Sequence, residues 1–116
     1  MADPISVYVD VDDTLVRKVG GREVTIPAVV RHIKRLHREG AVLHCWSDGG
    51  ADYARQTAQR LGIDSCFSFF LRKPHIFIDD ERSEEWPCFV HVFPTKLGTL
   101  NRYRIQIQKK KKASPA

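Results

Sequence analysis

No apolar run in this chain of 116 residues approaches the roughly 18 residues that a membrane-spanning helix needs. The N-terminus also lacks a basic stretch followed by an apolar one, which argues against a secretory signal. The five histidines show no ligand spacing, so we assign none of them to a metal. These absences predict a cytoplasmic protein without a membrane partner.

Cysteine is scarce, and its pattern excludes two kinds of site. Cys45, Cys66 and Cys88 are odd in number, widely spaced and set in apolar surroundings. Neither a disulfide framework nor a zinc site uses such spacing. We therefore expect three buried, reduced thiols, as is typical of cytosolic proteins.

The positive charge is concentrated at one end of the chain. Of a net charge of +5, four charges come from the run Lys109, Lys110, Lys111 and Lys112, so the rest of the chain is close to neutral. We predict one domain over residues 1–108 and a basic, disordered tail over residues 109–116. The tail could add weak, salt-sensitive affinity for nucleic acid. The absence of interleaved aromatic residues favours the alternative, a solvated C-terminal end that binds no nucleic acid.

Apolar stretches alternate with helical patterns along the chain. Helices are expected from Pro27 to Gly40 and from residue 51 to Gly62, because apolar residues recur there at helical spacing. Beyond Pro94 the pattern fits either a helix or a strand. The expected strands are 7–9, 41–46, 66–71 (or a buried turn), 76–78 and 89–93.

Strands that alternate with helices indicate an α/β fold with a mainly parallel, Rossmann-like sheet flanked by helices. Residues 15–26 interrupt that alternation with two short apolar stretches around Gly20-Gly21. This pattern predicts a β-hairpin directly after the first strand. We see neither an internal repeat nor a second domain.

Two carboxylates, Asp10 and Asp12, follow the apolar run of residues 7–9. Residues two apart in an extended segment point the same way, so both acids would face one site. Two adjacent carboxylates repel each other unless a proton or a cation lies between them. The alternative is a solvated turn at the end of the strand, with Thr14 in a position like that of an N-cap.

Three polar residues each follow an expected strand: Asp10, Ser47 and Asp79. Because parallel strands end at the same edge of a sheet, these residues would converge there, where open α/β sheets bind ligands. Each has a plainer interpretation as well. Ser47 could be the N-cap of the next helix, and Asp79 with Asp80 could form an ordinary turn.

The residues DVDDT (10–14), Ser47, Lys73 with Pro74, and Asp79 with Asp80 occur in the order and spacing of four known motifs. Over residues 5–80 the chain resembles the haloacid dehalogenase superfamily of phosphohydrolases. Any one motif alone is weak, and Lys73 by itself reads as a surface lysine. Asp13 stands where many members of that family carry glycine, and we interpret it as a turn residue.

The resemblance implies a role for each acid. Asp10 is the expected nucleophile, which forms an aspartyl-phosphate. Asp12 is expected to protonate the leaving oxygen and then to take a proton from the attacking water. The cofactor implied is Mg²⁺, bound by Asp10, Asp12 (through its carbonyl) and Asp79, with Asp80 as a further ligand through water.

Substrate binding is assigned to Thr14, Ser47 and Lys73. The resemblance implies that Ser47 hydrogen-bonds the phosphoryl group and that Lys73 offsets its charge, and both count as catalytic residues. A dehalogenase has no leaving oxygen to protonate, so Asp12 favours a Mg²⁺-dependent phosphomonoesterase over a dehalogenase.

Larger members of the family carry a cap domain over the site. Here residues 15–26 are long enough only for a hairpin flap, and residues 48–72 are used by a helix and a strand, which resembles a capless member. An uncovered site could admit a macromolecular phosphorylated substrate, or a partner subunit could serve as its lid. The alternatives are a catalytically weak phosphate- or nucleic-acid-binding module and a phosphoacceptor signalling domain.

Overall fold

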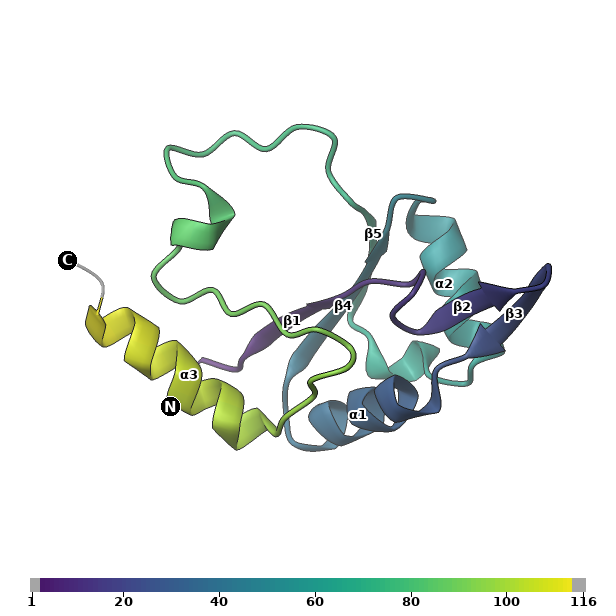
Figure 1. Cartoon of the computed structure of the whole chain (residues 1–116), viewed down its shortest axis with the longest axis horizontal. Coiled ribbons are helices and arrows are strands. Elements are labelled where there is room, and N and C mark those ends of the chain that lie inside the picture. Colours follow the sequence, from purple (N-terminus) through teal and green to yellow (C-terminus); the bar gives the residue numbers. More distant parts are fainter. Residues whose placement is uncertain (1–2, 114–116) are drawn as a thin grey trace. The chain divides into compact units, whose positions relative to one another are not determined.

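The computed structural model describes residues 3–113. The chain divides after Pro74 into two compact units, residues 1–74 and 75–116 (Figure 1). The first unit contains a parallel sheet, a hairpin and two helices. The second contains a long irregular stretch and one helix.

The sheet of the first unit has three parallel strands in the order β1-β4-β5. Their bounds are β1 (Ser6–Val9), β4 (Val42–Ser47) and β5 (Phe69–Arg72). The connections between them are α1 (Pro27–Arg38) and α2 (Ala51–Arg60). The expected α/β fold with a parallel sheet and flanking helices is therefore confirmed. All three strands end at the same edge.

Both helices lie on one face of the sheet, because the two crossovers proceed in the same direction across it. On that face Leu43 and Cys45 are fully buried. The opposite face carries aromatic rings, with Tyr8 stacked on His44 at 4.3 Å between ring centroids. Tyr8 is 49% exposed, so β1 is covered on one face only.

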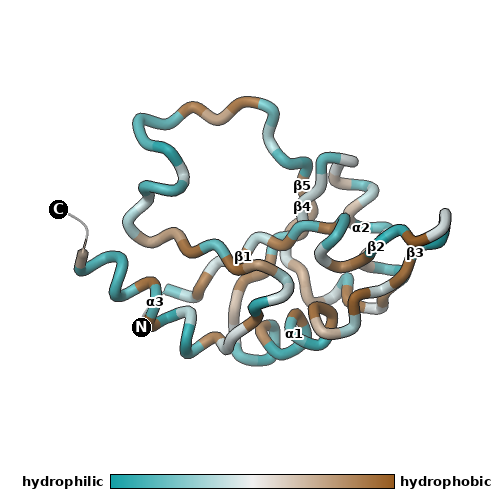
Figure 2. Tube along the Cα trace, viewed as in Figure 1, coloured by the Kyte–Doolittle hydropathy of each residue, from teal (hydrophilic) through white to brown (hydrophobic). Residues whose placement is uncertain are grey.

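Local sequence explains where α1 begins and ends. Pro27 occupies the first turn, where its missing N–H costs nothing. Gly40 follows the helix at φ 93°, a left-handed conformation that glycine adopts readily. Between them, apolar and polar residues alternate along the helix (Figure 2), and Val29, Ile33 and Leu36 are buried.

The predicted hairpin is present. Strands β2 (Val16–Val19) and β3 (Arg22–Thr25) pair in antiparallel register. The two glycines between them, Gly20 and Gly21, have φ values of 57° and 77°, as a type I′ turn requires.

The third strand begins later than expected. A 3₁₀ turn, η1 (Asp64–Cys66), occupies the start of the predicted segment 66–71, and β5 follows it. Cys66 is thus in a turn, where it is buried.

In the second unit the predicted strands 76–78 and 89–93 are absent, and that expectation is wrong. A three-residue apolar run becomes a strand only if a partner strand pairs with it. Instead, Phe77 and Phe89 each contact the ring of Trp86, at 5.2 and 5.4 Å between centroids, around the 3₁₀ turn η2 (Ser83–Glu85).

The ambiguous segment beyond Pro94 contains a helix, α3 (Leu100–Ala113). It includes the whole lysine run, which belongs to the tail that the sequence predicts to be disordered. Lys110 donates a hydrogen bond to the carbonyl of Phe89. Residues 114–116 of that expected tail lie outside the described residues. Over residues 3–113, no helix combines the length and apolarity needed to cross a membrane.

Candidate active site

The carboxyl ends of the three parallel strands bring Asp10, Ser47 and Lys73 together. The sequence predicted this convergence for Asp10 and Ser47, with Asp79 as the third residue. The ammonium Nζ of Lys73 lies 3.2 Å from Asp10 Oδ1. The backbone N–H of Lys73 donates to the Ser47 carbonyl at 3.0 Å. The Asp10 and Lys73 side chains are 34% and 31% exposed, so a solvent-borne ligand can reach both.

The loop after Asp10 is a tight turn built on one buried residue. Val11 is fully buried, and its carbonyl accepts the N–H groups of Thr14, Leu15 and Val16 at 2.8 to 3.2 Å. Asp13 has a φ of 62°, a left-handed conformation that aspartate tolerates better than most residues. This explains why aspartate is tolerated at this position of the turn, and it confirms Asp13 as a turn residue.

The N-cap alternative for Thr14 is wrong, because strand β2, not a helix, follows this turn. The backbone N–H of Thr14 is engaged within the turn. Its half-exposed side chain lies beside the two acids in sequence, and its contact with substrate stays a prediction.

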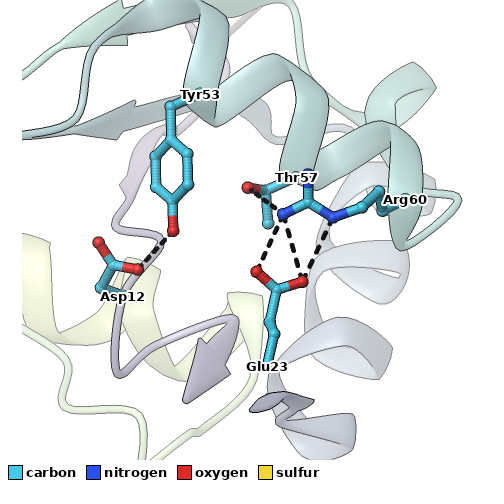
Figure 3. Close-up of polar contacts among 5 residues, drawn as sticks. All are labelled: Asp12, Glu23, Tyr53, Thr57 and Arg60. Atoms are coloured by element: carbon cyan, nitrogen blue, oxygen red, sulfur yellow. Dashed lines mark hydrogen bonds and ion pairs between the residues drawn. The ribbon is translucent and has the colours of Figure 1, made fainter. Parts of the chain in front are cut away.

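Asp12 has a partner that the sequence did not predict. The hydroxyl of Tyr53, in the first turn of α2, donates to Asp12 Oδ1 at 2.7 Å (Figure 3). This hydrogen bond is the main reason why the pKa of Tyr53 is raised to about 12, so the phenol keeps its proton at neutral pH. The position of Tyr53 in the sequence could have indicated this role. The helix α2 begins directly after the loop that follows Ser47, so its first turn lies at the edge of the sheet that carries Asp10 and Asp12.

Ser47 is 1% exposed, and its Oγ accepts the N–H of Gly49 at 3.0 Å. The N-cap position of α2 is Gly50, so the interpretation of Ser47 as the N-cap is wrong. A hydroxyl that accepts one hydrogen bond still has a proton to donate. Ser47 could therefore donate to a phosphoryl oxygen while its own place in the loop is held by Gly49.

Asp79 and Asp80 belong to the second unit, in an exposed stretch without a strand. Asp79 Oδ1 accepts the N–H of Glu81 at 2.9 Å, which is the local turn of the plainer interpretation. The predicted origin of Asp79 at a strand end is therefore wrong. Its role as a metal ligand stays a prediction.

Asp10 and Asp12 offer oxygen donors only, which is the chemistry that hard divalent cations prefer. Over residues 3–113, no group of three or more histidine, cysteine, aspartate or glutamate side chains is placed to hold a metal. Mg²⁺ commonly keeps several waters and needs only one or two carboxylates from the protein. Asp10 is partly exposed and offers one such carboxylate, and the binding of Mg²⁺ by Asp10 and the Asp12 carbonyl stays a prediction.

Two of the three cysteines are buried as expected, and Cys88 is exposed, which corrects that part of the prediction. Burial, with the nearby Asp10 carboxylate, raises the pKa of Cys45 to about 12. Burial also raises the pKa of Cys66. Both shifts lower the fraction of thiolate, which is the reactive form of cysteine.

Iodoacetamide should therefore alkylate native protein at Cys88 alone at pH 8. A thiol with a pKa of about 12 is about one part in 10,000 ionised at that pH. Peptide mass spectrometry would locate the label, and denatured protein should take up three labels. Modification of native Cys45 as fast as Cys88 would contradict this burial.

The chain was compared with protein-family models, curated proteins and solved structures, and none of them matched. The resemblance to the haloacid dehalogenase superfamily therefore depends on the four sequence motifs alone.

Proposed function

We propose that this protein is a phosphohydrolase of the haloacid dehalogenase type, which cleaves phosphate monoesters through an aspartyl-phosphate. The observation that carries the proposal is the contact of 3.2 Å between Lys73 and Asp10 at the end of parallel strands, with Asp12 two residues along. A structural ion pair alone would not explain a second acid in the adjoining turn or the serine on the neighbouring strand. A nucleophile, an acid and a cation in one place suit phosphoryl transfer.

In the first step, an oxygen of Asp10 forms a bond to phosphorus while the bond from phosphorus to the ester oxygen breaks. Asp12 gives its proton to that leaving oxygen. In the second step, water attacks phosphorus, its proton passes to Asp12, and the bond between Asp10 and phosphorus breaks. Lys73 stabilises the negative charge that gathers on the phosphoryl oxygens, and Ser47 donates a hydrogen bond to one of them.

The cofactor of the proposal is Mg²⁺, which would be held by the Asp10 carboxylate and the Asp12 carbonyl. Asp79 and Asp80 are included as ligands on the strength of the sequence pattern alone. A bound divalent cation supplies charge neutralisation, which lets a carboxylate approach an anionic ester.

The finer fold assignment is also part of the proposal. We assign a Rossmann-like, capless unit in which the hairpin β2-β3 serves as the flap. This is supported by the segment between β1 and α1, which forms a hairpin and no further domain. A site of this kind suits large phosphorylated substrates, or a partner subunit as a lid.

Purified protein should hydrolyse p-nitrophenyl phosphate in the presence of Mg²⁺, and EDTA should abolish the activity until excess Mg²⁺ restores it. Release of p-nitrophenol is followed by absorbance. A phosphate-binding module would release none, and a phosphoacceptor domain would retain a stable aspartyl-phosphate. Either of these results would refute the proposed hydrolase.

A further inference from the structure

One face of α2 contacts both the loop that carries Asp12 and the hairpin β2-β3. Tyr53, Thr57 and Arg60 are spaced by four and three residues, which places them on the same side of a helix. Figure 3 shows this side directed toward Asp12 and Glu23. Arg60 donates to both Glu23 carboxylate oxygens, at 2.9 and 3.2 Å, and to the Thr57 hydroxyl at 3.1 Å.

The place of the Tyr53 ring depends on a glycine. A Cβ atom added to Gly49 would lie 2.8 Å from Cδ2 of Tyr53 and 3.2 Å from its Cγ. These ring atoms lie close to the backbone of Tyr53, so the ring could not move aside without displacing its hydroxyl. Gly49 does not have a positive φ, so the constraint on this position is space.

We infer that Tyr53 is the positioning residue for Asp12 in proton transfer, with Gly49 providing the room for its ring. The inference rests on the proposed phosphohydrolase function. The hydroxyl of Tyr53 holds Asp12 Oδ1, so Oδ2 remains to exchange a proton with the leaving oxygen. The carboxylate belongs to an exposed residue, which without this contact would sample other rotamers.

If Tyr53 positions the acid Asp12, the loss of Tyr53 should affect substrates differently according to their leaving groups. An alkyl phosphate expels a strongly basic alkoxide and needs a proton, whereas p-nitrophenolate leaves with little help. The constant kcat/KM covers the steps up to release of the alcohol, so hydrolysis of the aspartyl-phosphate does not enter it. Loss of Tyr53 should therefore lower kcat/KM selectively for alkyl phosphates.

For Tyr53→Phe we expect kcat/KM for an alkyl phosphate to fall about tenfold and that for p-nitrophenyl phosphate to fall less than about twofold. Gly49→Ala keeps the hydroxyl and displaces the ring, so it should weaken the hydrogen bond from Tyr53 to Asp12. Tyr8→Phe is the matched control, since it removes a hydroxyl from the aromatic face of the sheet, and it should leave both constants unchanged.

A second readout needs neither metal nor turnover. In metal-free protein, NMR should detect a slowly exchanging hydroxyl proton on Tyr53, and that signal should be lost in Asp12→Ala. For Tyr53→Phe, an equal loss on both substrates or no loss at all would overturn the positioning role of Tyr53. An unprotected Tyr53 hydroxyl in the wild type would overturn it as well. None of these results would affect the proposed phosphohydrolase function. A wild-type protein without phosphatase activity would refute the proposed function and the inference with it.

Discussion

Asp10→Asn should reduce phosphatase activity by at least about 1,000-fold, since removing a catalytic nucleophile from an enzyme with a covalent intermediate usually costs more than this. An amide has no anionic oxygen with which to attack phosphorus. The same variant should not form the acid-stable but hydroxylamine-sensitive phosphoprotein that the wild type traps from a labelled substrate. Initial rates and rapid acid quench would measure the two effects.

The structure offers a closely matched control for this variant. Asp13→Asn is the same substitution three residues along the same loop, at a side chain that is 81% exposed. Asparagine tolerates the φ of 62° found there. Asp13→Asn should retain near-wild-type activity. If both variants lose activity equally, the loop has been disturbed and Asp10 has no special place in the chemistry.

The loss in Asp10→Asn should not arise from unfolding. Asp10 and Lys73 are each about one-third exposed, and partly exposed ion pairs contribute at most about 1 kcal/mol. Thermal unfolding of the variant should therefore stay within a few degrees of the wild type. A large drop in melting temperature would mean that the carboxylate has a mainly structural role.

Lys73→Met should lower kcat by about 100-fold or more, which is the usual effect of removing one group that stabilises transition-state charge. Methionine keeps most of the length of the lysine stem but has no ammonium to place near Asp10. Lys73→Arg keeps a positive charge and should recover part of the activity. Steady-state kinetics with p-nitrophenyl phosphate would measure these changes.

Lys34→Met is the control for charge removal, because Lys34 is exposed on α1 and has no role in the proposed site. It should leave kcat unchanged. If Lys73→Met were as active as Lys34→Met, the 3.2 Å contact with Asp10 would be a surface ion pair and nothing more.

Sequence patterns predicted those features whose cause is local. The hairpin follows from Gly20-Gly21 between apolar stretches, and α1 from the positions of Pro27 and Gly40. The convergence of Asp10 with Ser47 was predicted as well, although they are 37 positions apart in the printed sequence. Parallel strands end at one edge, so residues directly after two such strands must come near each other.

Other features depended on partners that a linear pattern does not reveal. Residues 76–78 are apolar enough for a strand, yet a strand exists only when another pairs with it. Cys88 has apolar neighbours in sequence and is nevertheless exposed. Tyr8 is exposed because both helices cover the other face of the sheet, which the direction of the crossovers determines.

By itself, then, the sequence determined α1, α2, the hairpin and the edge at which Asp10 and Ser47 gather. Only the tertiary structure decided that Tyr53 holds Asp12. This contact joins residues 41 positions apart, and it depends on which side of α2 faces the loop that carries Asp12. Periodicity tells which side of a helix is apolar, whereas the partner of a polar side chain depends on how that helix packs.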